Sequence, residues 1–381
     1  MRMRNAIRLA AAASLVLSVP AAAQTTASGA DQPRTGPISG YMELHLNIPV
    51  DRADGDPVLD FHRFVLLFSH SFSDRLRFVG ELEVEHAFVE GLEEAGELEL
   101  EQAYIDVLMR PSLNFRGGML LTPVGIINER HEPPVFYGVE RPFVDTVIIP
   151  TTWFEAGAGV HGRFGSAWSY RAYVMAPLDA TEFSADEGLR GSIQKGSRAN
   201  IRNPALTGRV EFTGVQSLTL GISGWRGDVG FNVPRLDPKV GVIEFDGRYR
   251  HAGFEARGQF AYVTISDVAR LNDALTLLIG VDPNIARALR GFYFEGSRLF
   301  GIPGIGHEIG VFARYENFDT QFKMAEGQLA IPQFDRAAWV VGASYFLDPD
   351  VAIKFDYTHQ KSESTLRRAP RSFNVGLGWW F

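Results

Sequence analysis

The chain has 381 residues, of which 45% are hydrophobic and 22% are charged, and its formal net charge is −8. That length is enough for one large or two medium domains, and the acidic balance argues against nucleic acid as a partner. Cysteine is absent from the sequence, which excludes a disulfide-stabilised core, thiolate metal sites and cysteine nucleophiles.

The N-terminal residues have the pattern of a secretory signal peptide. Arg2, Arg4 and Arg8 form a positively charged segment, an apolar stretch follows over 9–19, and alanines at 21–23 suit cleavage. Residues 24–39 are polar and rich in Thr, Gly and Pro, which predicts a flexible leader. After the signal peptide no apolar run approaches the roughly 18 residues of a transmembrane helix, so any membrane crossing must be made by strands.

From residue 41 onward, apolar and polar side chains alternate, as in strands with one apolar face. Segments of about ten residues, the length that a tilted strand needs to cross a bilayer, repeat along the chain. They predict sixteen strands, at 41–48, 59–70, 75–88, 97–110, 113–122, 153–164, 168–176, 205–212, 217–225, 239–250, 254–265, 290–298, 307–318, 336–346, 351–360 and 372–381.

The connections between these strands alternate strictly between short and long. Seven short turns lie at 71–74, 111–112, 165–167, 213–216, 251–253, 299–306 and 347–350. Eight long loops lie at 49–58, 89–96, 123–152, 177–204, 226–238, 266–289, 319–335 and 361–371, and the sixth of these has the spacing of a short helix. This alternation predicts an all-β fold, a transmembrane antiparallel β-barrel of sixteen strands, with fourteen or eighteen as alternatives. A soluble all-β protein would have no reason to keep its long loops at one end.

The last ten residues, SFNVGLGWWF, form an amphipathic strand that ends on Phe381. This ending resembles the C-terminal signal of bacterial outer-membrane barrels, which the assembly machinery of that membrane recognises. Aromatic residues, among them Phe164, Trp168, Phe254 and Trp379, gather at the level of the short turns, where an aromatic belt is expected.

If the apolar faces contact lipid, charged side chains must line the inside of the barrel. Such a set could not sit in a dry core without pairing or water, and it predicts a water-filled channel. The residues that we expect to line it are Glu81, Glu83, Glu85, Arg116, Arg163, Arg171, Arg209, Arg248, Arg250, Arg257 and Arg314. Acids on the third strand and arginines on strands five to eleven could form opposed walls with a transverse field; alternatively, many could be paired with one another.

The third long loop, 123–152, is dense in proline, aromatic and charged residues, unlike a solvated loop. We expect it to fold back into the barrel and narrow it, although an ordered lid or subunit-contact loop on the outside would show the same composition. Its charged residues, which would then face the opening, are Glu129, Arg130, His131, Glu132, Glu140, Arg141 and Asp145.

These features together resemble the bacterial outer-membrane porins over the whole chain after the signal peptide. The resemblance implies a Gram-negative outer membrane, a periplasmic leader over 24–39, a barrel over 40–381, a constriction formed by the third loop, and a homo-trimer. It implies passive diffusion of small hydrophilic solutes or ions, without a cofactor. Residues 100–125 are similar to a strand pair of the phosphate-selective porins, which bind anions through lumenal Arg and clustered Lys, whereas this chain has five Lys.

Signals for an enzyme are weak in this sequence. Residues 157–162 match the glycine pattern of dinucleotide-binding loops, but they lie inside a predicted strand and no helix follows. The glycines suit a crowded barrel wall instead. The alternatives to a general porin are an anion- or phosphate-selective porin and, beyond transport, a barrel enzyme or a structural barrel.

Overall fold

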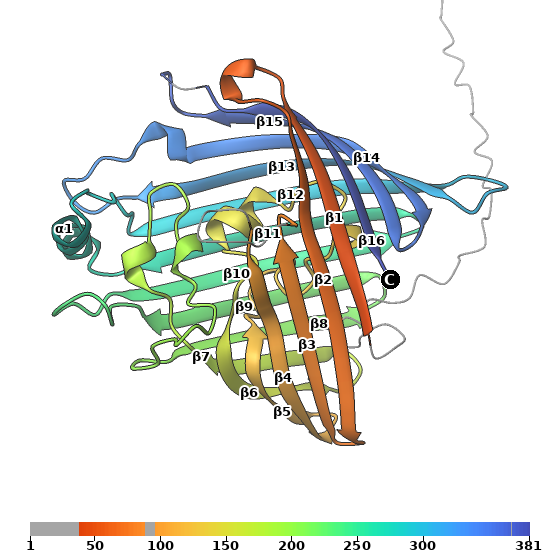
Figure 1. Ribbon diagram of the computed structural model, residues 1–381, viewed down its shortest axis with the longest axis horizontal. Helices are drawn as coiled ribbons and strands as arrows, with labels where there is room; N and C mark the ends of the chain where they lie inside the picture. Colours follow the sequence, from red (N-terminus) through yellow and green to blue (C-terminus); the bar gives the residue numbers. More distant parts are fainter. Residues whose placement is uncertain (1–37, 88–95, 367) are drawn as a thin grey trace, which may run out of the picture. The chain divides into compact units, whose positions relative to one another are not determined.

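The computed structural model describes residues 38–87, 96–366 and 368–381. In this part of the chain sixteen antiparallel strands, each paired with its sequence neighbours, close into a barrel through the β1–β16 ladder (Figure 1). The strands are β1 (Ile38–Pro49), β2 (Val58–Ser73), β3 (Leu76–Glu85), β4 (Leu98–Arg110), β5 (Leu113–Leu121), β6 (Phe154–Phe164), β7 (Trp168–Met175), β8 (Ala205–Val215), β9 (Leu218–Asp228), β10 (Lys239–His251), β11 (Phe254–Ile265), β12 (Ala288–Gly301), β13 (Glu308–Lys323), β14 (Asp335–Asp348), β15 (Val351–Ser362) and β16 (Arg371–Trp380). The predicted fold and strand number are confirmed.

The helical segments of the described residues all lie in connections between strands. They are the α-helix α1 (Val268–Ile279), the π-turn η3 (Val144–Ile148), and the 3-10 turns η1 (Arg52–Asp54), η2 (Pro133–Val135), η4 (Ala180–Glu182), η5 (Arg190–Ser192) and η6 (Pro332–Phe334). α1 is the helix that the sequence predicts in the sixth long loop. Within the described part of the chain, no helix has the length and apolar character needed to cross a membrane.

Most predicted strand boundaries lie within three residues of the observed ones. The one larger difference is an extension of β13, which continues to Lys323 rather than ending at 318. The sequence pattern that predicts the strand, its apolar alternation, ends at the polar rim of the barrel. The β-ladder continues beyond that point because backbone pairing does not need this alternation. β1 begins at Ile38, inside the predicted leader, while the predicted signal peptide and residues 24–37 lie outside the described residues.

Long and short connections alternate around the barrel as predicted, with the longest ones, 122–153, 176–204 and 266–287, all following odd-numbered strands. We refer to the two rims as the long-loop end and the short-turn end. α1 lies at the long-loop end (Figure 1). The predicted aromatic level lies at the short-turn end, where Trp168 contacts Phe212 with ring centroids 4.7 Å apart.

Each strand presents one face to the lumen and the other to the outside. On β10, Glu244 and Asp246 are buried, while Ile243, Phe245 and Tyr249 are exposed. Phe245 lies beside Ile222 of β9 and Phe260 of β11, so apolar side chains adjoin one another across three strands of the outer surface. The alternation follows from the two-residue period of a strand, and apolar outer faces are what a lipid-facing barrel requires.

We expect Phe245→Arg to destabilise the barrel by about 2–4 kcal/mol, because it places a charge on the lipid-facing band near mid-height. Thr264→Arg, on the same outer face of β11 but close to the long-loop end, should cost only about 0–1 kcal/mol. Urea unfolding of protein folded into phospholipid vesicles measures both. Equal costs for the two variants would contradict a lipid-facing band at this position.

Candidate functional site: the loop inside the barrel

The connection between β5 and β6, residues 122–153, lies inside the barrel. We call it the inner loop, and its ribbon lies within the ring of strands (Figure 1). Its base is closed by Asn128, whose amide nitrogen donates to the carbonyls of Thr122 (2.7 Å) and Trp153 (2.8 Å). The side-chain oxygen of Asn128, Oδ1, accepts from the Trp153 backbone amide at 2.7 Å. One buried side chain therefore holds both ends of the loop together.

Apolar side chains of the inner loop pack against one sector of the wall. Val144, Ile148 and Trp153 belong to a cluster of fully or nearly fully buried residues that includes Trp225 of β9 and Phe318 of β13. The Trp153 and Trp225 ring centroids are 5.4 Å apart. Because a fully buried Val or Ile contributes about 1.5–3 kcal/mol relative to exposure, this packing accounts for the loop folding inward rather than into solvent.

Polar contacts with the wall also hold the inner loop, both within the apolar sector and beside β15. The Val139 amide donates to Asp356 of β15 at 2.7 Å, and the Val144 amide donates to Glu316 of β13 at 3.1 Å. The Lys354 ammonium donates to the carbonyls of Pro133 (2.6 Å) and Gly138 (2.8 Å). Loop backbone groups that would be costly to bury alone thus find charged partners on the wall.

His131 ties the inner loop to acids on β3 and β4. Its Nδ1 lies 3.0 Å from the Asn128 carbonyl, and its Nε2 lies 3.2 Å from Glu101 and 3.9 Å from Glu81. Burial alone would lower the pKa of His131, but the carboxylate of Glu101, with that of Glu81, raises it to about 10. His131 is therefore a cation at neutral pH, and its charge offsets that of the acidic strands.

Most of the predicted channel residues point inward, and many of them are paired on the wall. Glu81 and Glu83 are buried and Glu85 is half-buried, whereas Arg163 is exposed near the short-turn end. The remaining arginines have acidic partners at 2.5–2.9 Å, in the pairs Arg116–Asp106, Arg171–Glu129, Arg209–Asp246, Arg248–Glu255, Arg250–Glu255, Arg257–Glu295 and Arg314–Glu316. Six of these pairs are salt bridges between residues of the wall, the alternative to an unpaired basic wall, whereas Arg171 pairs with Glu129 of the inner loop.

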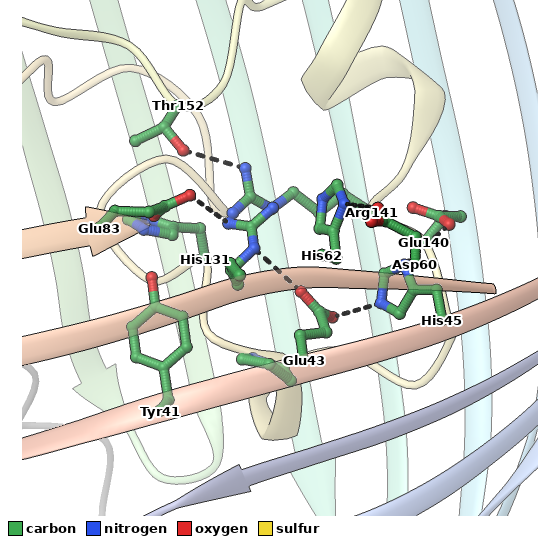
Figure 2. A network of polar contacts seen from close by, with 12 residues as sticks. Tyr41, Glu43, His45, Asp60, His62, Glu83, His131, Glu140, Arg141 and Thr152 are labelled. Atoms are coloured by element: carbon green, nitrogen blue, oxygen red, sulfur yellow. Dashed lines mark hydrogen bonds and ion pairs between the residues drawn. The ribbon is translucent and has the colours of Figure 1, made fainter. Parts of the chain in front are cut away.

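The inner loop and the wall leave an outer cavity of about 360 Å³ on the side of β1, β2, β15 and β16. Two predicted loop residues, Glu140 and Arg141, line it together with Glu43 and His45 (Figure 2). Arg63 lines it as well. Glu140 lies 3.0 Å from His45 Nδ1, and His45 Nε2 lies 3.0 Å from Glu43. Charged groups from the inner loop and from two strands therefore border the outer cavity together.

A second space, an inner pocket of about 10 Å³, lies on the other side of the loop. Glu129 and Arg130 line it, and Arg130 faces Glu211 of β8 at 3.6 Å. Asp145 faces the wall, where it accepts from Gln259 at 2.8 Å, while buried His131 and half-buried Glu132 line neither space. Four of the seven predicted loop residues thus border the two spaces.

Several charged residues of the site are absent from the sequence-based set. Arg63 and His62 are adjacent yet both line the outer cavity, because a β-bulge opposite Glu43 and His45 changes the phase of β2. Because both faces of β2 are apolar in the sequence, alternation does not show which of its side chains face the lumen. Asp106 and Glu295 lie directly opposite Arg116 and Arg314 on neighbouring strands, and this pairing depends on strand register, which local alternation does not give.

Gly157 and Gly159 of the dinucleotide-like pattern lie within β6. A Cβ added to Gly159 would lie 2.1 Å from the Ala172 carbonyl oxygen, and one added to Gly157 would lie 2.6 Å from that of Val174. These glycines allow β7 to approach closely, which accounts for them without a nucleotide.

No protein-family model matches the chain. A protein of Aquifex aeolicus (strain VF5), described as an uncharacterized protein, is 36% identical over 359 residues, covering 90% of this chain and 79% of that relative. Among solved structures, the outer membrane channel DcaP of Acinetobacter baumannii aligns with a TM-score of 0.57 at 12% identity, over 90% of this chain and 96% of DcaP.

Two further porin structures give similar alignments. The anion-selective porin from Comamonas acidovorans has a TM-score of 0.55 at 13% identity, over 90% of this chain and 98% of the porin. OmpF of Salmonella typhi, in complex with daunomycin, has a TM-score of 0.55 at 10% identity, over 90% and 97%. These alignments show that the chain has the fold of outer-membrane porins.

The position of the inner loop can be tested with a disulfide, because the chain contains no other cysteine. An ideal Cβ on Gly376 of β16 lies 3.6 Å from the Cβ of Val139, within the 3.5–4.5 Å typical of disulfides. We expect Val139→Cys with Gly376→Cys to crosslink nearly completely, shown by a thiol-dependent shift in non-reducing electrophoresis. Val139→Cys with Leu377→Cys, whose side chain points outward, is the control and should stay reduced.

Asp145 should make stability depend on pH. Burial raises its pKa to about 7, from 3.8 in the unfolded chain, and its Oδ2 has no hydrogen-bond partner among the described residues. Because the folded state holds this proton more tightly, the contribution is present at low pH and is lost as pH rises toward 7 and above. Asp145→Asn should remove a loss on the order of 2 kcal/mol between pH 5 and pH 8.

The measurement for Asp145 is urea unfolding at the two pH values. Exposed Asp237, changed to Asn, serves as the control and should follow the wild-type pH profile. An Asp145→Asn profile that coincides with the wild type would show that the buried carboxyl carries no such cost.

Proposed function

Because this chain belongs to one family with the Aquifex aeolicus protein and has the fold of outer-membrane porins, we propose that it is a porin. In this proposal it resides in the outer membrane of a Gram-negative bacterium and forms a water-filled channel. Small hydrophilic solutes or ions diffuse through the channel passively. No catalytic step and no cofactor are part of the proposal.

The inner loop is the observation that carries this proposal. It occupies one sector of the lumen with apolar packing and leaves charged groups around the outer cavity on the other sector. A structural barrel would gain most by filling its interior with apolar side chains, since each buried charge needs a partner or water. A lumen that keeps a cavity bordered by Glu43, Arg63, Glu140 and Arg141 suits passage of polar solutes better.

The proposal includes a homo-trimer and insertion by the outer-membrane assembly machinery, with Phe381 as part of the assembly signal. A structural neighbour, OmpT of Vibrio cholerae, is described as a trimer form, and it aligns with a TM-score of 0.54 at 11% identity. The Phe381 side chain is half exposed, and its amide and carbonyl pair with Gly40 of β1. The last residue therefore also completes the ladder that closes the barrel.

An anion-selective porin is the second candidate, and the lining of the outer cavity favours it. Arg63, Arg141 and Arg190 line this cavity, against two acids, Glu43 and Glu140. A net positive lining attracts anions. The sign of the ion selectivity distinguishes this candidate from a cation-preferring or general channel.

The deciding experiment is single-channel recording of the refolded protein in a planar bilayer with unequal salt on the two sides. Long-lived conductance steps are expected, in groups of three for a trimer, and the reversal potential gives the ion preference. A silent membrane, with strand content intact by circular dichroism, would overturn the channel and favour a barrel enzyme or a structural barrel.

Neutralising Glu81, Glu83 and Glu85 together, as Glu→Gln changes, should shift the selectivity toward anions. The change removes the acidic groups of this wall and leaves Arg63 and His131, which contact Glu83 and Glu81, less compensated. The reversal potential under a salt gradient is the readout. Glu326→Gln, in the exposed connection before β14, is the control, and an unchanged potential in the triple variant would refute a role for this wall.

A further inference from the structure

Two histidines and an aspartate converge at the long-loop end, beside the outer cavity. Asp60 and His62 belong to β2, and His86 follows directly after β3. Asp60 Oδ2 lies 3.2 Å from His62 Nδ1 and 2.9 Å from His86 Nδ1. All three ligand-type atoms lie within 4.8 Å of one another. The topology thus brings His86 to two residues that lie 24 and 26 positions before it in the chain.

The spacing of these atoms suits a small divalent cation. Ligands that lie about 2.0–2.1 Å from a tetrahedral Zn²⁺ are roughly 3.3 Å apart from one another, close to the two distances observed. Two imidazole nitrogens with one carboxylate oxygen are a donor set for borderline transition metals such as Zn²⁺, Cu²⁺ and Ni²⁺. A carboxylate that accepts hydrogen bonds from two imidazoles would give the same contacts without a metal, so the two explanations need a direct test.

The cluster is accessible to water, and neighbouring side chains fix the orientation of its imidazole rings. The side chains of Asp60 and His86 are 23% and 48% exposed, and His62 lines the outer cavity. The His45 ring stacks on His62 with centroids 4.8 Å apart, and His45 is itself fixed between Glu43 and Glu140 (Figure 2). A cation can reach the three ligands from solution, and water can complete its coordination.

The β-bulge in β2 is what directs His62 to this position. Without it, adjacent His62 and Arg63 would point to opposite faces of the wall, and His62 would face lipid. Arg63 forms ion pairs with Glu43 at 3.1 Å and Glu83 at 3.9 Å, so acids outside the cluster compensate its charge.

We propose that Asp60, His62 and His86 bind one divalent transition-metal cation of the Zn²⁺ class at the edge of the outer cavity. This inference goes beyond the proposed channel and does not rest on it, because the ligands, their spacing and their access to solvent are independent of conduction. If the channel assignment also holds, an ion bound here adds positive charge beside the cavity and obstructs it.

The test is titration calorimetry of the full refolded barrel in detergent, freed of metal with a chelator, using ZnCl₂ alone. One Zn²⁺ per chain is expected. Asp60→Asn, His62→Ala and His86→Ala should each weaken binding at least about tenfold, since even residues that only orient metal ligands contribute that much. His251→Ala, at the short-turn end of β10, is the matched control and should bind as the wild type does.

Folding of each variant is checked by strand content, and His86→Ala is informative even if His62→Ala folds poorly, because His86 is half exposed outside a strand. Cobalt provides a second measurement on the unaltered protein, since Co²⁺ in a tetrahedral nitrogen and oxygen site absorbs in the visible range. Absence of both a Zn²⁺ binding heat and this absorption would overturn the proposal.

A second group of ligand-type residues, Glu81, Glu101 and His131, is buried in the barrel. Variants of this group test whether Zn²⁺ binds there instead. Zn²⁺ binding that is lost in Glu101→Gln and kept in His86→Ala would move the site there and overturn the proposal. Zn²⁺ binding lost in His86→Ala supports it. Zn²⁺ binding by a barrel that never conducts would overturn the porin assignment and leave the metal site standing, so the two failures are distinguishable.

Discussion

The β1–β16 ladder closes the sheet on itself, and neither the lumen nor the inner loop could exist without that closure. In lipid an open strand edge would leave a row of N–H and C=O groups without partners, each costing several kcal/mol. The ladder runs to the last residue, where Phe381 pairs with Gly40. Once the edge is closed, the outward face must be apolar and the inward face is free to carry charge, which is the division observed along β10.

Closure creates an interior that the chain then divides in two. The inner loop fills one sector with buried apolar side chains, anchored by the contact between Trp153 and Trp225, and leaves the other sector to charged groups. Arginines on the wall pair with acids on the adjacent strand, as Arg314 does with Glu295, or one strand further, as Arg209 does with Asp246. Their desolvation is therefore compensated locally. The charges of the outer cavity are different, because they come from the inner loop, from β1 and β2 and, at Arg190, from the connection after β7. Their arrangement exists only while the inner loop is docked.

The loop and the wall are energetically coupled through a few residues. Asn128 joins the two ends of the loop, His131 joins it to the acidic strands, and Lys354 holds two of its carbonyls. Each is buried, so the loss of one partner would leave the other without a hydrogen bond in a low-dielectric interior. The shape of the outer cavity, and access to the cluster around His62, therefore follow from contacts that lie elsewhere in the lumen.

The barrel, its sixteen strands, the side of the wall that faces lipid and the alternation of turns and loops are all predictable from the amino-acid pattern, because strand period and loop length are local properties of the chain. The sequence also pointed to residues 123–152 by their composition. How the charges pair and which of them border a cavity follow from the folded barrel, since Arg314 meets Glu295 through strand register, which local patterns do not encode. The fold alone places Arg63 and His62 on the same side, because a bulge changes the phase of an otherwise uniform apolar strand. The cluster of Asp60, His62 and His86 likewise depends on bringing separate segments of the chain together, which no spacing along the sequence indicates.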